Sequence, residues 1–269
     1  MGEMLKETDP DQEVLVERKG PVLWVTFNRP QSRNAMTWNM YDRLVEVCGE
    51  VNHDGSVKAM VLTGAGGEAF VAGTDISQFR DFKTEQDAID YEARGNRVMQ
   101  TLETVRVPTI AAIAGACTGG GAAIAASCDL RIASPSARYG FPIARTLGNC
   151  LSMQNYARLF ALLGMAKIKD IIFTARLMDA AEMLECGLLS EVTPDEQSLL
   201  VRAQDLAELV ASHAPLTIWA TKEALRKIRD RLIPPDGDES LIAAVYMSKD
   251  FRRGVDAFLT KRTPEWSGE

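Results

Sequence analysis

Two glycine-containing segments of this chain are suited to hold a negatively charged oxygen through backbone N–H groups alone. One is the turn at Gly73 that precedes Thr74, and the other is the run Gly119-Gly120-Gly121. The glycine run leads into an alanine-rich stretch, 122–127, that is typical of a helix. The N–H groups at a helix start lack intrahelical acceptors and lie at the positive end of the helix dipole. They therefore suit a bound anion or an oxyanion that forms during a reaction.

The glycine run does not match the common nucleotide-binding loops. No Lys-Ser or Lys-Thr pair follows residues 115–121, so a nucleoside-triphosphate loop is not indicated. The run also lies far from the N-terminus, and no acidic residue ends a following strand as a dinucleotide fingerprint requires. Five cysteines and two histidines show no metal-ligand spacing, and no metal site is therefore expected.

The elements that position these loops follow from the spacing of apolar residues. Short apolar runs punctuated by glycine predict strands, and apolar residues three and four apart predict helices. The predicted strands are 22–27, 57–62, 109–113 and 129–133, with a further short apolar stretch at 70–76. The predicted helices are 36–51, 85–102, 122–127, 153–163, 166–173, 180–186, 195–212, 216–228 and 241–258. Alternating strands and helices, followed by helices alone, predict an α/β fold with a helical C-terminal region.

Composition and charge exclude several classes of protein. With 46% hydrophobic and 25% charged residues, the 269-residue chain is typical of a globular protein. The net charge of -7, without a block of Lys and Arg, argues against nucleic acid as a partner. The longest apolar run, 110–128, is broken by glycines and is not a membrane span, and the acidic N-terminus lacks the apolar stretch of a signal peptide. A cytoplasmic protein without a membrane partner is expected.

Short motifs occur in an order that resembles the crotonase (enoyl-CoA hydratase/isomerase) superfamily. They are Asn28-Arg29-Pro30, Asn34-Ala35-Met36, 62–66, 69–76, 108–115, Gly119-Gly120-Gly121, 127–133, 173–177 and 257–264. Each motif is short, but the ordered set extends from residue 14 to the C-terminus. The resemblance implies a spiral of repeated ββα units at 14–200, preceded by a flexible N-terminus at 1–13. It also implies a C-terminal helical trimerisation region at 201–269, with trimers or hexamers as the assembly.

The resemblance further implies that the partner is an acyl-CoA thioester. The thioester oxygen would bind to the N–H groups of Thr74 and Gly120, which would stabilise an enolate by about 3–4 kcal/mol per donor. A side chain at position 120 would obstruct the thioester, which accounts for glycine there. The implied CoA contacts are Arg33, Ala35, Ala72, Asp75, Ile76 and, from a neighbouring subunit, Lys261. No cofactor beyond the CoA of the substrate is expected.

The chain departs from the family at the residues that transfer protons. The two glutamates of a hydratase fall on Ala123 and Ile143, and a third acid used by some isomerases falls on Ser152. None of the three can exchange a proton as a carboxylate does, and loss of such a group costs roughly 10²–10⁴-fold in rate. The thioester-binding residues are therefore retained while the usual acid–base residues are absent.

Three hypotheses follow, and the sequence leaves them open. The first is a hydratase/isomerase-type lyase or isomerase of fatty acid metabolism whose proton-transfer group is unidentified. The second is a decarboxylase or thioester hydrolase in which Arg145 binds a substrate carboxylate. The third is a non-catalytic acyl-CoA-binding protein. Cys150 and Ser152 are further polar candidates, and Tyr91 and Glu92 lie on a predicted helix where either pocket or solvent would suit them.

Overall fold

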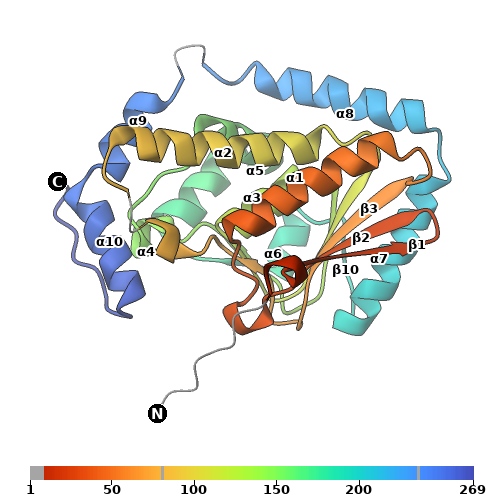
Figure 1. Ribbon diagram of the computed structural model, residues 1–269, viewed down its shortest axis with the longest axis horizontal. Helices are drawn as coiled ribbons and strands as arrows, with labels where there is room; N and C mark the ends of the chain where they lie inside the picture. Colours follow the sequence, from red (N-terminus) through yellow and green to blue (C-terminus); the bar gives the residue numbers. More distant parts are fainter. Residues whose placement is uncertain (1–8, 80–81, 235–236) are drawn as a thin grey trace.

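Two sheets form the frame of the molecule, and the chain alternates between them. Figure 1 labels β1, β2 and β3 of the first sheet side by side. The computed structural model describes residues 9–79, 82–234 and 237–269. The first sheet has the order β1-β2-β3-β5-β7-β10, in which only β1 is antiparallel to its neighbour. Its strands are β1 Val14–Lys19, β2 Val22–Phe27, β3 Ala59–Gly64, β5 Thr109–Ile113, β7 Leu130–Ala133 and β10 Glu191–Val192. The second sheet contains β4 Ala69–Ala72, β6 Ala116–Thr118, β8 Arg138–Gly140 and β9 Met178–Asp179.

Three successive ββα units account for this alternation. Each unit places one strand in the first sheet and the next strand in the second, as in β3 and β4, β5 and β6, and β7 and β8. After the first two pairs a helix returns the chain to the first sheet, as parallel strand order requires. After β8, helices lead to β9 of the second sheet before the chain reaches β10 of the first. The fold is therefore the spiral of ββα units that the family resemblance implied.

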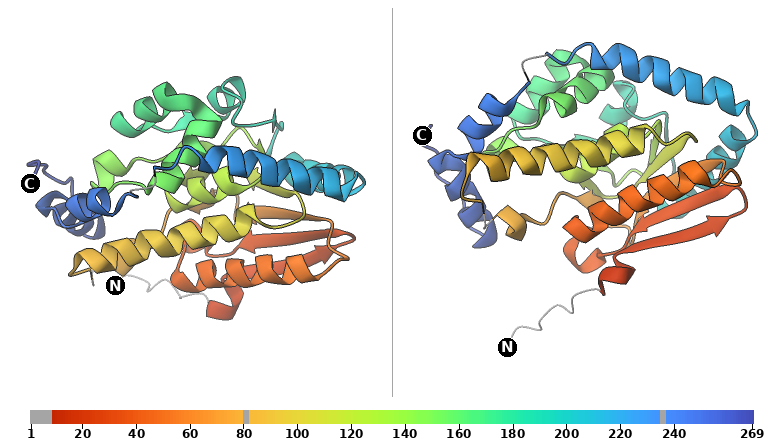
Figure 2. Two further views of the ribbon diagram at one scale, coloured as in Figure 1. Left: turned by 90° about the horizontal axis from the view of Figure 1, so that it is seen from above. Right: turned by 45° about the horizontal axis from the view of Figure 1, so that its top comes forward.

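Helices cover both sides of this frame. They are α1 Trp38–His53, α2 Glu85–Glu103, α3 Gly120–Ser127, α4 Ile143–Thr146, α5 Met153–Phe173, α6 Ala180–Glu185, α7 Glu196–Ala211, α8 Pro215–Asp230, α9 Glu239–Tyr246 and α10 Lys249–Leu259. Short 3-10 turns are η1 Pro10–Gln12, η2 Pro30–Ser32 and η3 Ile76–Phe79. Helices α1 and α2 lie side by side (Figure 2), and α9 and α10 pack at one end of α2.

Strand β2 shows why both faces of the first sheet are covered. Its side chains alternate, so Val22 and Trp24 pack toward α7 while Val25 and Phe27 enter the main core. A strand buried on both faces reads as a continuous apolar run, which explains why the sequence of β2 shows no polar face.

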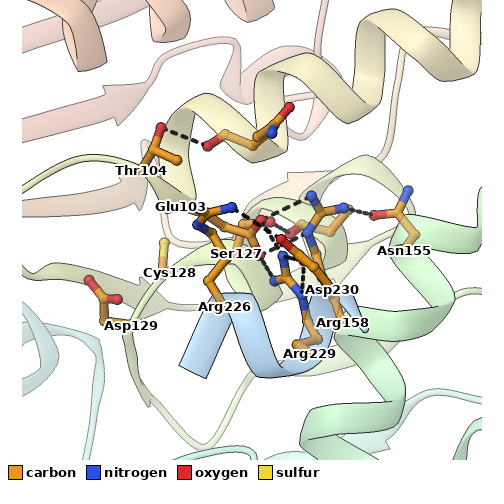
Figure 3. Close-up of polar contacts among 12 residues, drawn as sticks. Glu103, Thr104, Ser127, Cys128, Asp129, Asn155, Arg158, Arg226, Arg229 and Asp230 are labelled. Atoms are coloured by element: carbon orange, nitrogen blue, oxygen red, sulfur yellow. Dashed lines mark hydrogen bonds and ion pairs between the residues drawn. The ribbon is translucent and has the colours of Figure 1, made fainter. Parts of the chain in front are cut away.

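A buried ion cluster ties three helices together (Figure 3). The carboxylate of Glu103 on α2 accepts hydrogen bonds from the guanidinium groups of Arg158 on α5 and Arg229 on α8. No residue of α8 is buried in the chain, so these polar contacts and the Lys222–Asp129 ion pair at 2.6 Å hold this helix against the body.

Most predicted elements are confirmed, and the differences have local causes. The predicted helix at 241–258 is two helices, because Ser248 caps the start of α10 by accepting from the N–H of Phe251. The predicted helices at 153–163 and 166–173 are joined through Gly164, which has a φ of 70°. Strands β1, β6, β8, β9 and β10 and the short helix α4 are additional elements.

Regular secondary structure extends across or up to two of the predicted region boundaries. A boundary at residue 200 would divide α7, which packs its buried Leu199, Ala203 and Ala207 onto the first sheet and belongs to the core. The N-terminal region predicted as flexible includes η1 and the buried Glu13, whose carboxylate lies 3.2 Å from Arg29. Residues 1–8 of that region lie outside the described residues. Within the part of the chain that is described, no helix is both long and apolar enough to cross a membrane.

Candidate active site

One cavity contains both residues that the sequence predicted as oxyanion donors, Thr74 and Gly120. Its walls come from α1, the β4–η3 segment, α2, the start of α3, α4 and the loop after it, with Phe258 of α10 at one side. The lining residues are Trp38, Tyr41, Ala72, Gly73, Thr74, Ile76, Phe79, Tyr91, Glu92, Gly95, Met99, Thr118, Gly119, Gly120, Ala123, Phe141, Pro142, Ile143, Thr146, Leu147, Asn149, Leu151, Asn155 and Phe258. Thr74 and Gly120 therefore share a cavity with Ala123 and Ile143.

The backbone at Thr74 is fixed by a bridge to the segment before α1. Met36 donates its N–H to the carbonyl of Gly73 at 2.9 Å and accepts from the N–H of Asp75 at 2.9 Å. Because N–H groups alternate in direction along an extended chain, this pairing turns the N–H of Thr74 away from Met36. Gly73 has a φ of 104°, a conformation that other residues rarely adopt, which explains the glycine before Thr74.

Gly120 is the first residue of α3 and lies directly beside Thr74. Its N–H belongs to the first turn, where helical N–H groups lack intrahelical acceptors. A Cβ atom at this position would lie 2.3 Å from the hydroxyl oxygen of Tyr41 and 3.0 Å from Oγ1 of Thr74. The structure thus adds a second reason for glycine at position 120, because any side chain would overlap with Tyr41.

Two tyrosine hydroxyls meet at the Thr74 side chain. The hydroxyl of Tyr41 lies 2.9 Å from Oγ1 of Thr74, and that of Tyr91 lies 3.5 Å from the same atom. Burial raises the pKa of Tyr41 to about 12 and raises the pKa of Tyr91 well above its usual value. Both hydroxyls therefore stay protonated and form a neutral, hydrogen-bonded wall beside Gly120.

The cavity wall contains one carboxyl group among the described residues, and it belongs to Glu92. Glu92 is 7% exposed and projects from α2, on the same side of that helix as Gly95 and Met99. The sequence favoured an exposed side chain at this position, with the pocket as the alternative, because a glutamate on a charged helix normally faces water. The burial of Glu92 could have been inferred from its four-residue spacing from Ala88, because residues four apart lie on the same face of a helix and Ala88 is buried.

The surroundings of Glu92 favour its protonated form more than water does. Burial raises the pKa of the carboxyl from 4.5 to about 7, and the charge of Asp238 acts in the same direction. The hydroxyl of Tyr246 on α9, 2.5 Å from Oε1, and a backbone N–H of Ser152 oppose this shift. Asn149 donates to the Tyr246 oxygen at 3.3 Å and so extends the chain of hydrogen bonds.

Three polar residues predicted as catalytic candidates lie outside the cavity wall. Arg145 is exposed, because it follows Ile143 by two positions in α4 and points roughly 200° away from the cavity-lining side chain. Burial raises the pKa of the Cys150 thiol to about 12, which disfavours a thiolate nucleophile. Ser152 is fully buried, where it caps α5 and donates to Asn96 at 2.7 Å.

The predicted CoA contacts divide into two groups. Ala72 and Ile76 line the cavity, and the exposed Arg33 lies next to Ala72, whose N–H donates to the Arg33 carbonyl at 3.0 Å. Lys261 is exposed beyond α10, three residues after the cavity-lining Phe258.

Ala35 and Asp75 are held by Arg29. The guanidinium donates to the Ala35 carbonyl at 2.6 Å and lies 3.4 Å from the carboxylate of Asp75. Asp75 also accepts hydrogen bonds from the N–H and hydroxyl of Ser77, at 3.2 and 2.7 Å, and so caps η3 as a side-chain oxygen at a helix start commonly does. Within the described residues, no group of three or more His, Cys, Asp or Glu is placed to hold a metal ion.

Relatives with named activities match nearly the whole chain. A short-chain-enoyl-CoA hydratase from Clostridium acetobutylicum is 36% identical over 258 residues, which cover 94% of this chain and 96% of that protein. A probable enoyl-CoA hydratase, echA8, from Mycobacterium tuberculosis is 34% identical and covers 94% of this chain and 97% of its own.

Solved structures of similar proteins share the fold. Methylmalonyl-CoA decarboxylase in complex with 2-nitronate-propionyl-CoA is similar with a TM-score of 0.87 at 26% identity, over 96% of this chain and 99% of the other. An enoyl-CoA hydratase from Bacillus anthracis has a TM-score of 0.72 at 29% identity, over 96% of this chain and 100% of the other. A model of the enoyl-CoA hydratase/isomerase family matches residues 17–269. This chain belongs to the enoyl-CoA hydratase/isomerase family.

Proposed function

We propose that the chain is an acyl-CoA lyase or isomerase that forms an enolate of the thioester. In this proposal the thioester oxygen accepts hydrogen bonds from the backbone N–H groups of Thr74 and Gly120. The observation that carries it is the placement of these two residues side by side in the wall of one cavity. Preorganised donors of this kind stabilise a developing oxyanion by about 3–4 kcal/mol each. No cofactor besides the CoA of the substrate is required for this chemistry.

The lining of the cavity supports an uncharged acyl group as the substrate. The residues that line it include no Lys, Arg or His within the described chain, and several are aromatic or aliphatic. A buried carboxylate on the substrate would lack a cation and would cost free energy to desolvate. Ala123 and Ile143 add apolar surface where the family's glutamates would lie.

A decarboxylase is the second candidate because of the overall similarity to methylmalonyl-CoA decarboxylase. Loss of CO₂ would form the enolate without a base. The predicted carboxylate-binding residue, Arg145, is exposed and lies outside the cavity wall. The described lining of the cavity therefore offers no cation that could bind the carboxylate of a decarboxylase substrate. Release of CO₂ from a malonyl-type thioester would support the decarboxylase candidate.

Assembly into trimers or hexamers is proposed together with the activity. Large apolar side chains are exposed on the single chain, including Phe173 at 75%, Met165 at 57% and Ile228 at 68%. Exposed apolar surface on two helices is typical of a protein interface. An adjacent subunit would also bring its Lys261 to the CoA. Sedimentation equilibrium, which gives the mass of the assembly, tests this part of the proposal.

The substitution Gly120→Ala tests the thioester site. The activity on an enoyl-CoA substrate should fall by about 10²–10³-fold, as on loss of one oxyanion donor, because a Cβ at position 120 would keep the thioester oxygen from reaching the N–H. Gly49→Ala is the matched control, because a Cβ at Gly49 on α1 meets no heavy atom within 4 Å. The double variant Gly120→Ala with Tyr41→Phe removes the overlap with the tyrosine oxygen. If this double variant recovers full activity, then glycine is required at position 120 because of the overlap with Tyr41 and not because of the thioester. If Gly120→Ala alone is fully active, the proposed site is wrong.

A further inference from the structure

The wall of the cavity holds one group that can take up and release a proton near neutral pH. The glutamate positions of the family are occupied by Ala123 and Ile143, whereas Glu92 reaches the same cavity from α2. Gly95, one turn further along α2, also lines the cavity, and a Cβ there would meet no heavy atom within 4 Å. The cavity is therefore open at Gly95, one helical turn from Glu92 on the same side of α2.

We propose that Glu92 is the catalytic acid–base residue and that it moves one proton between two carbons of a β,γ-unsaturated acyl-CoA. This inference rests on the proposed function, because the enolate must be held by Thr74 and Gly120 while the proton is moved. It assigns the reaction as an isomerisation, a class that needs one acid–base group. Hydration by the family's usual route uses two carboxyl groups, and the described cavity wall contains one.

The proposed step is balanced without any co-reactant. The Glu92 carboxylate removes a proton from the α-carbon, and the C–H electron pair forms the α-carbon–carbonyl double bond of the enolate, whose oxygen carries the negative charge. The protonated Glu92 then delivers the same proton to the γ-carbon. The enolate electrons return to form the α,β double bond as the β,γ double bond is lost. The product is the conjugated isomer, and Glu92 is again a carboxylate.

The groups that face Glu92 permit both of its protonation states. They are Tyr41 on α1, Tyr91 on α2, Cys150 before α5, Tyr156 on α5, and Asp238 and Tyr246 at α9. None is a cation, and the described groups that shift the pKa of Glu92 include no Lys, Arg or His. Burial raises its pKa to about 7, so the carboxyl can accept a proton and release it again without a large mismatch in either step. Tyr246, which donates to Oε1, is a positioning residue.

The test compares Glu92→Gln with the wild-type chain in two assays. The first follows conversion of 3-hexenoyl-CoA to its conjugated isomer, and the second follows exchange of α-protons of hexanoyl-CoA in D₂O by mass spectrometry. Both rates should fall by about 10²–10⁴-fold, the usual contribution of an acid–base residue. Binding of hexanoyl-CoA, measured by calorimetry, should change by less than about threefold. Glu85→Gln is the matched control, because Glu85 is an exposed glutamate on the same helix.

The possible results separate this inference from the proposed function. If Glu92→Gln keeps the wild-type rates, the Glu92 assignment is overturned while the acyl-CoA activity stands. If the wild-type chain binds the thioesters but neither isomerises nor exchanges, both are overturned and the non-catalytic hypothesis is supported. Activity on crotonyl-CoA that adds water and survives Glu92→Gln also overturns the assignment. In the wild type, kcat/KM should rise with pH through about 7, because the carboxylate is the form that removes the proton.

Discussion

Glu92 is buried and Glu103 has a side chain 9% exposed; both lie on the same helix, and their surroundings are opposite. They lie eleven positions apart on α2, close to three helical turns. Glu103 accepts hydrogen bonds from the guanidinium groups of Arg158 and Arg229 (Figure 3). Glu92 receives its hydrogen bonds from the Tyr246 hydroxyl and a backbone N–H of Ser152.

This difference shows that burial alone does not make a carboxyl group an acid–base catalyst. A buried carboxylate between two guanidinium groups has its charge matched, and its role is to join helices. A buried carboxyl that contacts only neutral donors has no opposite charge nearby, and its pKa rises to about 7 in the case of Glu92. The neighbours of each glutamate, rather than its depth, therefore indicate which one carries chemistry.

The largest expected effect on stability is that of Glu103→Gln. The substitution leaves Arg158, whose side chain is 2% exposed, and Arg229 without their common anion. Removal of one partner from a buried ion cluster typically costs about 3–5 kcal/mol of the free energy of unfolding. Urea unfolding of the variant measures this loss, and Glu92→Gln at pH 8 is its control on the same helix. A loss below about 1 kcal/mol would show that the cluster does not hold α8 to the body.

The second expected effect is a pH dependence of stability that comes from Glu92. Its pKa is about 7 in the folded chain against 4.5 in its usual state, so between these values only the folded chain holds the proton. The stabilising contribution is complete below about pH 4.5 and is lost as the pH rises through 7, and linkage gives roughly 2–3 kcal/mol between pH 5 and pH 8. Urea unfolding of the wild type and of Glu92→Gln at both values isolates this contribution. Parallel curves for the two proteins would contradict the raised pKa.

The third effect tests how far the neighbours of Glu92 set its pKa, by removing the hydroxyl group that donates a hydrogen bond to it. Tyr246→Phe keeps the ring and removes the hydroxyl that favours the carboxylate form, so the pKa of Glu92 should rise further. A hydrogen bond to a charged group contributes about 1.5–3 kcal/mol, and since the Ser152 N–H remains, a shift of about one pH unit is expected. The acid limb of the kcat/KM profile measures it. Tyr139→Phe is the control, because it removes a buried hydroxyl that donates to Ala122.

The framework of the site could be predicted from the sequence because it depends on local patterns. The strands at 22–27, 57–62 and 109–113 are apolar runs bounded by turn residues, and the structure has strands at these places. The positions of Thr74 and Gly120 in one cavity follow from two short motifs whose backbone conformations require glycine at Gly73 and a helix start at Gly120.

The position of Glu92, the proposed acid–base residue, could not be predicted in the same way because its burial depends on distant contacts. Tyr246 lies 154 positions after Glu92, and nothing in the local pattern of 85–102 indicates that α9 will cover this part of α2. Arg145 was chosen for its charge, whereas its direction depends on the short helix α4, which the sequence did not reveal. Periodicity locates a buried face, but it cannot identify a charged residue that belongs to that face.

The smallest effect belongs to an exposed ion pair that contains the same two residue types as the Glu103 cluster. Arg43 and Glu50 on α1 lie 2.9 Å apart with side chains 36% and 58% exposed. Exposed pairs contribute about 0.2–1 kcal/mol, because water already solvates both charges and salt screens them. Glu50→Gln should therefore lower the free energy of unfolding by less than about 1 kcal/mol, and by still less at high salt. If Glu50→Gln cost as much as Glu103→Gln, the contrast between the two glutamates of α2 could not be assigned to their buried surroundings.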